Sequence, residues 1–229
     1  MLLSGKRWRD CYPFGRDRAV ELTTTQATEF IFRAPSETEI AEARAALPAD
    51  AQAIGLFTRL IKITPAYLEV IRQVLRRKPD AHFLVGGTGD PRMVQAFMAD
   101  DELAGRVTFL HHNVNLAAYA HAIDVFVDTF PMIGGLACRE IVAQGVPVLG
   151  LRSNEWGLKQ DQDRDPQSIA DDEPALIDLI CRTLTDVAFR EARAAAAAAT
   201  IDVISDVATS AAEIDAAMMG ALRAARKRS

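Results

Sequence analysis

The stretch "DTFPMIGGLACREIVAQGVPVLGL", residues 128–151, is the part of the sequence that says most about the fold. It predicts, in order, a strand end, a glycine turn, a helix, a glycine stop and a second strand. Gly134 and Gly135 stand where the chain leaves the turn and starts the helix, and Glu140 follows about one and a half turns into that helix. A unit of this kind is typical of parallel α/β sheets.

The same alternation of short apolar runs and helix-period segments extends upstream. The apolar runs are nearly continuous, as in strands that are buried on both faces of a sheet. We therefore predict an α/β fold, a Rossmann-like parallel sheet with helices on both faces, followed by C-terminal helices. The predicted strands are 53–57, 81–87, 106–110, 123–129 and 146–151.

The chain divides into three predicted segments. Residues 1–50 are predicted to be an irregular N-terminal extension or linker with one short helix, which a capping box of Ser36 and Glu39 opens. Residues 51–190 are predicted to form the Rossmann-like domain. Residues 191–229 are predicted to form alanine-rich C-terminal helices, because alanine is the best helix former.

Composition excludes several classes of protein. The 229 residues carry a formal net charge of -5, which gives no general attraction to nucleic acid or an anionic membrane. The apolar runs are far shorter than the roughly 18 residues of a membrane span, and the N-terminus lacks the apolar core of a signal peptide. The widely spaced Cys11, Cys138 and Cys181 suggest neither a zinc site nor a disulfide framework. We expect a cytoplasmic protein without a metal site.

Loops that follow the carboxyl ends of parallel strands share one rim of the sheet, where ligands bind. The loop "FTRLIKITP" follows the first predicted strand and contains Thr58 and Lys62. A lysine beside a helix start can neutralise a phosphate. An ordinary surface lysine is the alternative.

Two further rim loops are candidates for ligand contacts. "GGTGDPR", residues 86–92, allows close backbone approach, but it is not a GxGxxG motif and does not follow the first strand. A plain turn with Asp90 capping the next helix is its alternative. "HHNVN", residues 111–115, contains His112 and Asn113, whose backbone can pair with a base. A plain polar loop is the alternative there.

The fourth rim loop is the glycine turn itself. Backbone N–H groups at Gly134 and Gly135 can face an anion, and the helix start adds about half a positive charge. Glu140 lies at a reach suited to the hydroxyls of an attached ribose, with a solvated helix glutamate as the alternative. Micromolar binding requires about 8 kcal/mol, and a helix start contributes about 1 kcal/mol. Several loops must therefore act together.

The segments "GLFTRLIKITP", "RVTFL" and the stretch 128–151 resemble the C-terminal, nucleotide-sugar-binding half of GT-B glycosyltransferases. The likeness covers roughly residues 50–190. Within this superfamily, the chain is most similar to protein O-GlcNAc transferases and bacterial adhesin N-glycosyltransferases, in which a Phe-Pro segment also precedes the glycine turn. The resemblance implies one half of a GT-B fold that binds a nucleotide-sugar, with a UDP-sugar as donor substrate and no cofactor.

The resemblance also implies roles for single residues. Lys62 would meet the donor pyrophosphate and stabilise the leaving UDP, which makes it the candidate catalytic residue. Glu140 would bind the donor ribose, and the backbone of Gly135, Leu136 and Ala137 would hold the diphosphate. Polar side chains of the phosphate turn in that family are replaced by apolar residues or glycine here, so we expect weaker donor binding. Asn113 or Asn115 stands nearest to the basic residue that contacts the base.

Three interpretations remain open at this point. A GT-B enzyme has two Rossmann-like domains with the active site between them, and residues 1–50 are too few to form the second. The first interpretation is a glycosyltransferase donor domain, of hexosyl or GlcNAc type, that works with an N-terminal acceptor-binding domain or a partner chain. The second is a non-catalytic module that binds protein. The third is an epimerase-type enzyme that acts on a nucleotide-sugar.

Overall fold

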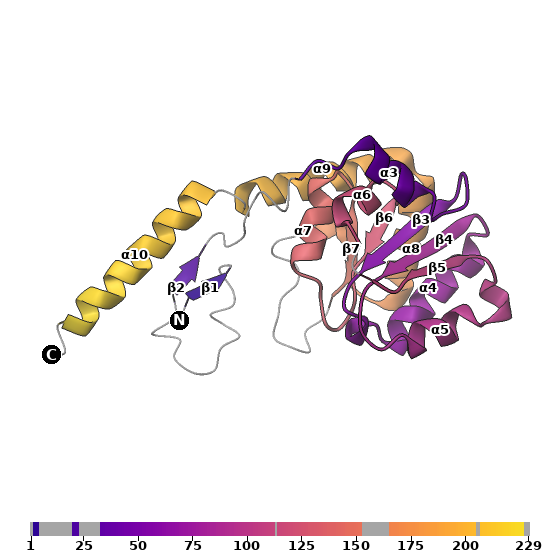
Figure 1. Ribbon diagram of the computed structural model, residues 1–229, viewed down its shortest axis with the longest axis horizontal. Helices are drawn as coiled ribbons and strands as arrows, with labels where there is room; N and C mark the ends of the chain where they lie inside the picture. The colour runs from indigo at the N-terminus through magenta and orange to yellow at the C-terminus, as the bar shows by residue number, and fades with distance from the viewer. Residues whose placement is uncertain are drawn as a thin grey trace.

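The computed structural model describes residues 2–4, 20–22, 33–112, 114–152, 165–204 and 207–226. Within these residues, six parallel strands form one sheet in the order β5-β4-β3-β6-β7-β8 (Figure 1). The strands are β3 (Gln52–Phe57), β4 (Ala81–Gly86), β5 (Val107–Leu110), β6 (Val125–Val127), β7 (Val148–Leu151) and β8 (Ile169–Ala170).

The predicted α/β fold is confirmed, and the predicted strands match β3 to β7. The central strands β3 and β4 are buried along almost their whole length, which explains their continuous apolar sequence. The sequence analysis did not predict β8. It is two residues long and follows a polar segment, so it carries no period that sequence reasoning can detect.

Helices cover both faces of the sheet (Figure 1). The chain moves from β3 to β4 in one direction and from β6 to β7 in the other, so right-handed crossovers place their helices on opposite faces. One face carries α4 (Pro65–Arg77), α5 (Arg92–Met98) and α8 (Glu173–Thr185), and the other carries α6 (Leu116–Ala120) and α7 (Leu136–Ala143).

The helix α4 is the main support of the first face. Its buried side presents Tyr67, Ile71 and Leu75 to the sheet, at helical spacing. The Tyr67 hydroxyl donates to the carbonyl of Val127 at 2.9 Å, so the helix also fixes the end of β6.

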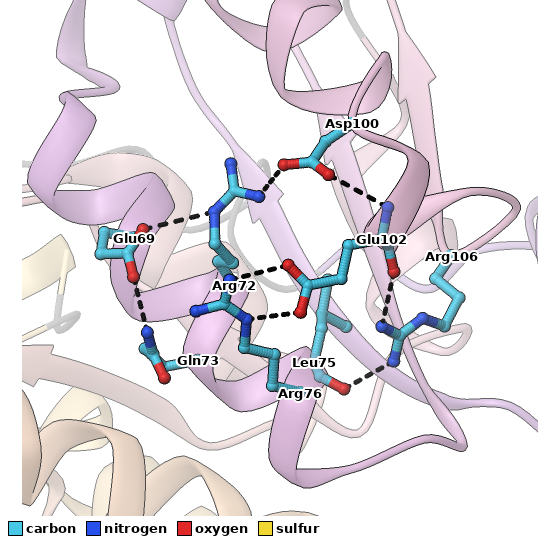
Figure 2. A network of polar contacts seen from close by, with 8 residues as sticks. All are labelled: Glu69, Arg72, Gln73, Leu75, Arg76, Asp100, Glu102 and Arg106. Carbon is cyan, nitrogen blue, oxygen red and sulfur yellow. Dashed lines mark hydrogen bonds and ion pairs between the residues drawn. The ribbon is translucent and has the colours of Figure 1, made fainter.

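A network of polar contacts fixes the outer side of α4 (Figure 2). Arg76 donates to both carboxylate oxygens of Glu102 at 2.6 and 2.7 Å, and Arg72 pairs with Asp100. The guanidinium of Arg106 reaches the carbonyl of Leu75 at 2.5 Å. These partners belong to or flank the short helix η3 (Asp101–Leu103), so the network joins α4 to the chain that leads into β5.

The N-terminal segment contains the predicted short helix, α3 (Glu37–Arg44). Its capping box is confirmed: the Ser36 hydroxyl accepts from the backbone of Glu39 at 3.3 Å, and the Glu39 carboxylate accepts from the backbone of Ser36 at 2.8 Å. Upstream, β1 (Leu2–Ser4) and β2 (Val20–Leu22) form a parallel pair.

Two long helices follow the sheet domain. The helix α9 (Val187–Ile204) packs against α7 and α8, and α10 (Val207–Arg226) extends away from the sheet (Figure 1). The predicted domain limit at residue 190 falls inside α9, and the division into three segments stays a prediction. In the described part of the chain, no helix is both long and apolar enough to cross a membrane.

A buried ion pair fastens α9 to the edge of the sheet. Arg193 donates to the carboxylate of Asp165 at 2.7 Å, with side chains that are 11% and 8% exposed. The same carboxylate accepts from the Ser168 hydroxyl at 2.9 Å, in the short helix η5 (Pro166–Ser168) that precedes β8.

Candidate functional site

The site lies where the direction of the sheet reverses. The first strand of the sheet, β3, is central, with β4 on one side and β6 on the other. In doubly wound sheets whose crossovers run on opposite faces, ligands bind in the crevice at the carboxyl ends of the strands where the order reverses, which here are β3 and β6. The loop after β3 and the loop after β6 meet there.

A lysine joins these two loops. The Lys62 ammonium donates to the carbonyl of Ile133 at 2.8 Å, and the Thr64 hydroxyl donates to the carbonyl of Phe130 at 3.3 Å. Lys62 ends the short helix η2 (Leu60–Lys62), which is fixed by its buried Leu60. The structure therefore brings Lys62 and the glycine turn together, as the sequence analysis expected of two loops on one rim.

The glycine turn is held from the inside by Asp128, the residue after β6. Its carboxylate is buried and accepts from the backbone of Thr129 at 2.8 Å and of Gly134 at 2.7 and 2.9 Å. The Thr129 hydroxyl donates to the carbonyl of Met132 at 2.6 Å. These bonds fold the turn back on the end of its strand.

The two glycines have different surroundings. A Cβ atom on Gly134 would lie 2.6 Å from the nearer Asp128 oxygen and 2.7 Å from the Cys138 sulfur, whereas a Cβ on Gly135 would meet nothing within 4 Å. The N–H of Gly134 points at Asp128 and is thus engaged inside the protein. Sequence reasoning assigned both glycines to the anion, and the structure leaves only Gly135 in open space.

The helix α7 begins immediately after this turn. Its N-cap is Gly135, which has no side chain to cap the helix, so the first backbone N–H groups, at Leu136 and Ala137, have no side-chain acceptor at the cap. Leu136 is 42% exposed. The first turn of α7 is therefore an accessible group of N–H donors with a favourable dipole for an anion.

Glu140 lies on the following turn of α7 and is half-buried. Burial raises the pKa of its carboxyl group above the usual value near 4.5. Among the described residues, no hydrogen bond or ion pair to this carboxylate is formed. A desolvated acceptor without a partner is suited to hydroxyl donors of a ligand.

A pocket opens beside the crevice, at the ends of β3 and β4. Its volume is ≈ 250 Å³, and it brings together Thr58 and His112, which the sequence analysis selected separately. Asn113 lies outside the described residues. The lining residues are Phe57, Thr58, Arg59, Gly86, Gly87, Thr88, His112, Val114 and Leu116.

Sequence reasoning missed Arg59 and Thr88 in this pocket. Arg59 stands in the same loop as Lys62, and a second cation in one rim loop was a signal that the sequence analysis did not use. In the neighbouring loop, Asp90 accepts from the backbone of Arg92 at 3.1 Å, but the N-cap of α5 is Pro91 without a side-chain cap hydrogen bond, so the expected cap by Asp90 was wrong. Within the described ranges, no cluster of side chains is suited to hold a metal ion.

Comparison with solved structures identifies the architecture. An O-GlcNAc transferase variant from Thermobaculum terrenum is 21% identical, with a TM-score of 0.68 over 95% of this chain and 44% of its own. HepE from Anabaena, in complex with UDP and glucose, is 15% identical, with a TM-score of 0.76 over 95% of this chain and 62% of its own. The fold is that of one half of a GT-B glycosyltransferase.

A third GT-B structure agrees with these two. The pneumococcal O-GlcNAc transferase GtfA, in complex with UDP and GlcNAc, is 14% identical, with a TM-score of 0.65 over 88% of this chain and 41% of its own. The chain thus spans between about two fifths and two thirds of the GT-B chains it matches. No protein-family profile matches the chain, and neither does any curated protein. The resemblance found in the sequence is confirmed at the level of the fold.

Proposed function

We propose that this GT-B half binds a UDP-sugar and serves as the donor domain of a glycosyltransferase. The observation that carries the proposal is the contact between the Lys62 ammonium and the carbonyl of Ile133, directly before the accessible start of α7. An ammonium group has three donors, so two remain for a diphosphate. The Lys62 ammonium and the first N–H groups of α7 can then bind the same diphosphate.

The three parts of a UDP donor have separate places in this proposal. The diphosphate lies at the N–H groups of Leu136 and Ala137, beside Lys62. The ribose hydroxyls donate to Glu140, whose carboxylate has no partner within the described residues. The base enters the pocket that Thr58, Arg59 and His112 line.

The reaction in this proposal is transfer of a glycosyl group. The bond between the sugar C1 and the UDP oxygen breaks, a bond from C1 to an acceptor atom forms, and the acceptor proton passes to a base. Lys62 and the dipole of α7 stabilise the charge that develops on the departing UDP, and this makes Lys62 a catalytic residue. The acceptor and its base belong to an N-terminal domain or a partner chain, and they are outside this half of the fold.

One observation favours a second candidate, a non-catalytic module that binds protein. Exposed apolar side chains stand in the two loops and at the start of α7: Ile61 is 78% exposed, Leu136 is 42% exposed and Met132 is 39% exposed. Such side chains suit a protein surface better than a diphosphate. The same positions offer no hydroxyl group to a phosphate.

Calorimetric titration separates the two candidates. The folded chain is titrated with UDP, UDP-glucose and UDP-GlcNAc, and with GDP as the control for the base. We expect micromolar, uridine-selective binding, with turnover only when an acceptor half is supplied. No binding at millimolar nucleotide, by protein whose circular dichroism shows it to be folded, would contradict the donor-domain proposal and favour the module.

A further inference from the structure

We propose that Asp128 is the positioning residue of this site. Its carboxylate holds the glycine turn in the conformation that directs the first N–H groups of α7 toward Lys62. The part of this inference that concerns UDP and pyrophosphate rests on the proposed function above. The part that concerns the conformation of the turn does not depend on any ligand.

The contacts of Asp128 span the turn from its first residue to its end. The side chain is 2% exposed, and it accepts from the N–H of Thr129 at 2.8 Å and of Gly134 at 2.7 and 2.9 Å. Hydrogen bonds from N–H groups to an ionised carboxylate are stronger than those to a neutral acceptor. One buried side chain thereby sets the distance between the end of β6 and the start of α7.

The glycine at position 134 is explained by this contact. A Cβ atom there would lie 2.6 Å from the Asp128 oxygen, closer than such atoms approach in proteins. Gly134 therefore allows the carboxylate to reach the backbone, and its N–H group is turned away from the crevice. The open glycine of the pair, Gly135, is the one that faces outward.

The turn is held on both sides. Asp128 binds the N–H of Gly134, and Lys62 binds the carbonyl of Ile133, which belongs to the same peptide group. A buried negative charge close to an anion site opposes anion binding through space. The presence of Asp128 at this position thus requires a structural reason, and fixing this peptide group supplies it.

The test compares D128N with the matched control D124N. Asp124 stands at the other end of β6, where its carboxylate also accepts a backbone N–H, that of Ala53, at 2.8 Å. In D128N an amide nitrogen, which is itself a donor, replaces the carboxylate oxygen that accepts from Gly134 at 2.9 Å, and the negative charge is removed. Each variant is titrated with UDP and with inorganic pyrophosphate, and the hydrogen exchange of the Gly134 amide is measured without ligand.

We expect D128N to accelerate exchange at Gly134 about tenfold or more, because the fixed turn is lost. This loss should outweigh the removal of the opposing charge, so UDP and pyrophosphate should both weaken by a similar factor. D124N should change neither, even if it lowers the melting temperature. Unchanged exchange and unchanged affinities in folded D128N would overturn the inference.

Two further outcomes are distinguishable. If the wild-type chain binds neither UDP nor pyrophosphate, the proposed function fails, and the exchange at Gly134 alone decides the role of Asp128. If D128N does not fold, G134A tests the same contact from the other partner: the inference requires a loss for both UDP and pyrophosphate, and retained binding contradicts it.

Discussion

The ammonium of Lys62 and the carbonyl oxygen of Ile133 lie 2.8 Å apart, although 71 residues separate them in the sequence. This single contact joins the loop after β3 to the loop after β6, across the point where the order of the sheet reverses. The cation is thus fixed beside the start of α7 by contacts within the protein alone. A site that is arranged in advance loses less entropy on binding.

Replacement of Lys62 by alanine should weaken UDP binding about tenfold or more, because one charged contact contributes roughly 1.5–3 kcal/mol. Calorimetric titration measures the loss. The matched control is K78A, since Lys78 lies at the other end of α4, beside the amino ends of the strands. Equal affinities in K62A and wild-type protein would remove Lys62 from the site.

Replacement of Glu140 by alanine should weaken UDP but leave inorganic pyrophosphate almost unaffected, because only UDP carries the ribose hydroxyls. We expect a loss of about tenfold for UDP, for one or two hydrogen bonds to a charged acceptor. Titration of one variant with both ligands provides an internal control. Equal losses for the two ligands would refute the ribose assignment.

The pH dependence of stability should report the burial of Glu140. Its pKa is raised in the folded protein, so between the unfolded value near 4.5 and the higher folded value the folded state binds more protons than the unfolded state. Stability therefore decreases as pH rises through this range. We expect E140Q to be more stable than wild-type protein at pH 7, and this gain should disappear below about pH 4.

Thermal unfolding of E140Q and wild-type protein across pH 3–8 measures this difference. A difference in melting temperature between the two proteins that stays constant at every pH would show that burial does not destabilise the charged Glu140 carboxylate.

The two glycines of the turn should respond differently to alanine. G134A forces the new methyl group against Asp128 and Cys138, so we expect destabilisation of about 1–3 kcal/mol and weaker pyrophosphate binding. G135A meets open space and should change stability far less. Chemical denaturation and pyrophosphate titration of the two variants compare them. A larger effect at Gly135 than at Gly134 would contradict the described packing.

The buried pair of Arg193 and Asp165 should contribute strongly to the attachment of α9. R193A leaves the Asp165 carboxylate buried without its cation, so we expect a loss of about 3 kcal/mol or more in the free energy of unfolding. The control is R77A, which breaks the exposed pair with Asp178 and should cost about 0.5 kcal/mol. Similar losses in both variants, measured by urea denaturation, would show that burial does not strengthen the pair.

Much of the fold could be predicted because its signals are local. Continuous apolar runs indicated β3 to β7, and the capping box at Ser36 indicated the start of α3. The two-residue strand β8 could not be predicted, since its pairing with β7 depends on tertiary contacts. Local signals likewise placed Lys62 and the glycine turn on one rim.

The finer features of the site depend on contacts between distant residues. In the sequence, Asp128 is simply a polar residue at the end of an apolar strand. Nothing in the sequence shows that its carboxylate accepts a hydrogen bond from the backbone of Gly134. The sequence does not distinguish the two glycines, although a Cβ atom would collide with Asp128 and Cys138 at Gly134 and would meet nothing within 4 Å at Gly135. Likewise, the desolvation of Glu140 depends on the neighbours that surround α7.

The close packing of Asp128, Gly134 and Cys138 has a consequence for how chains with this architecture diverge. As long as an acid ends the strand and a sulfur lies ten residues further on, any side chain at the position between them forces one of these groups to move. A substitution at any one of these three positions then favours compensating substitutions at the other two. We therefore expect other chains that form this turn in the same way to combine an acid at the strand end with a glycine six residues later, even where little other sequence similarity remains.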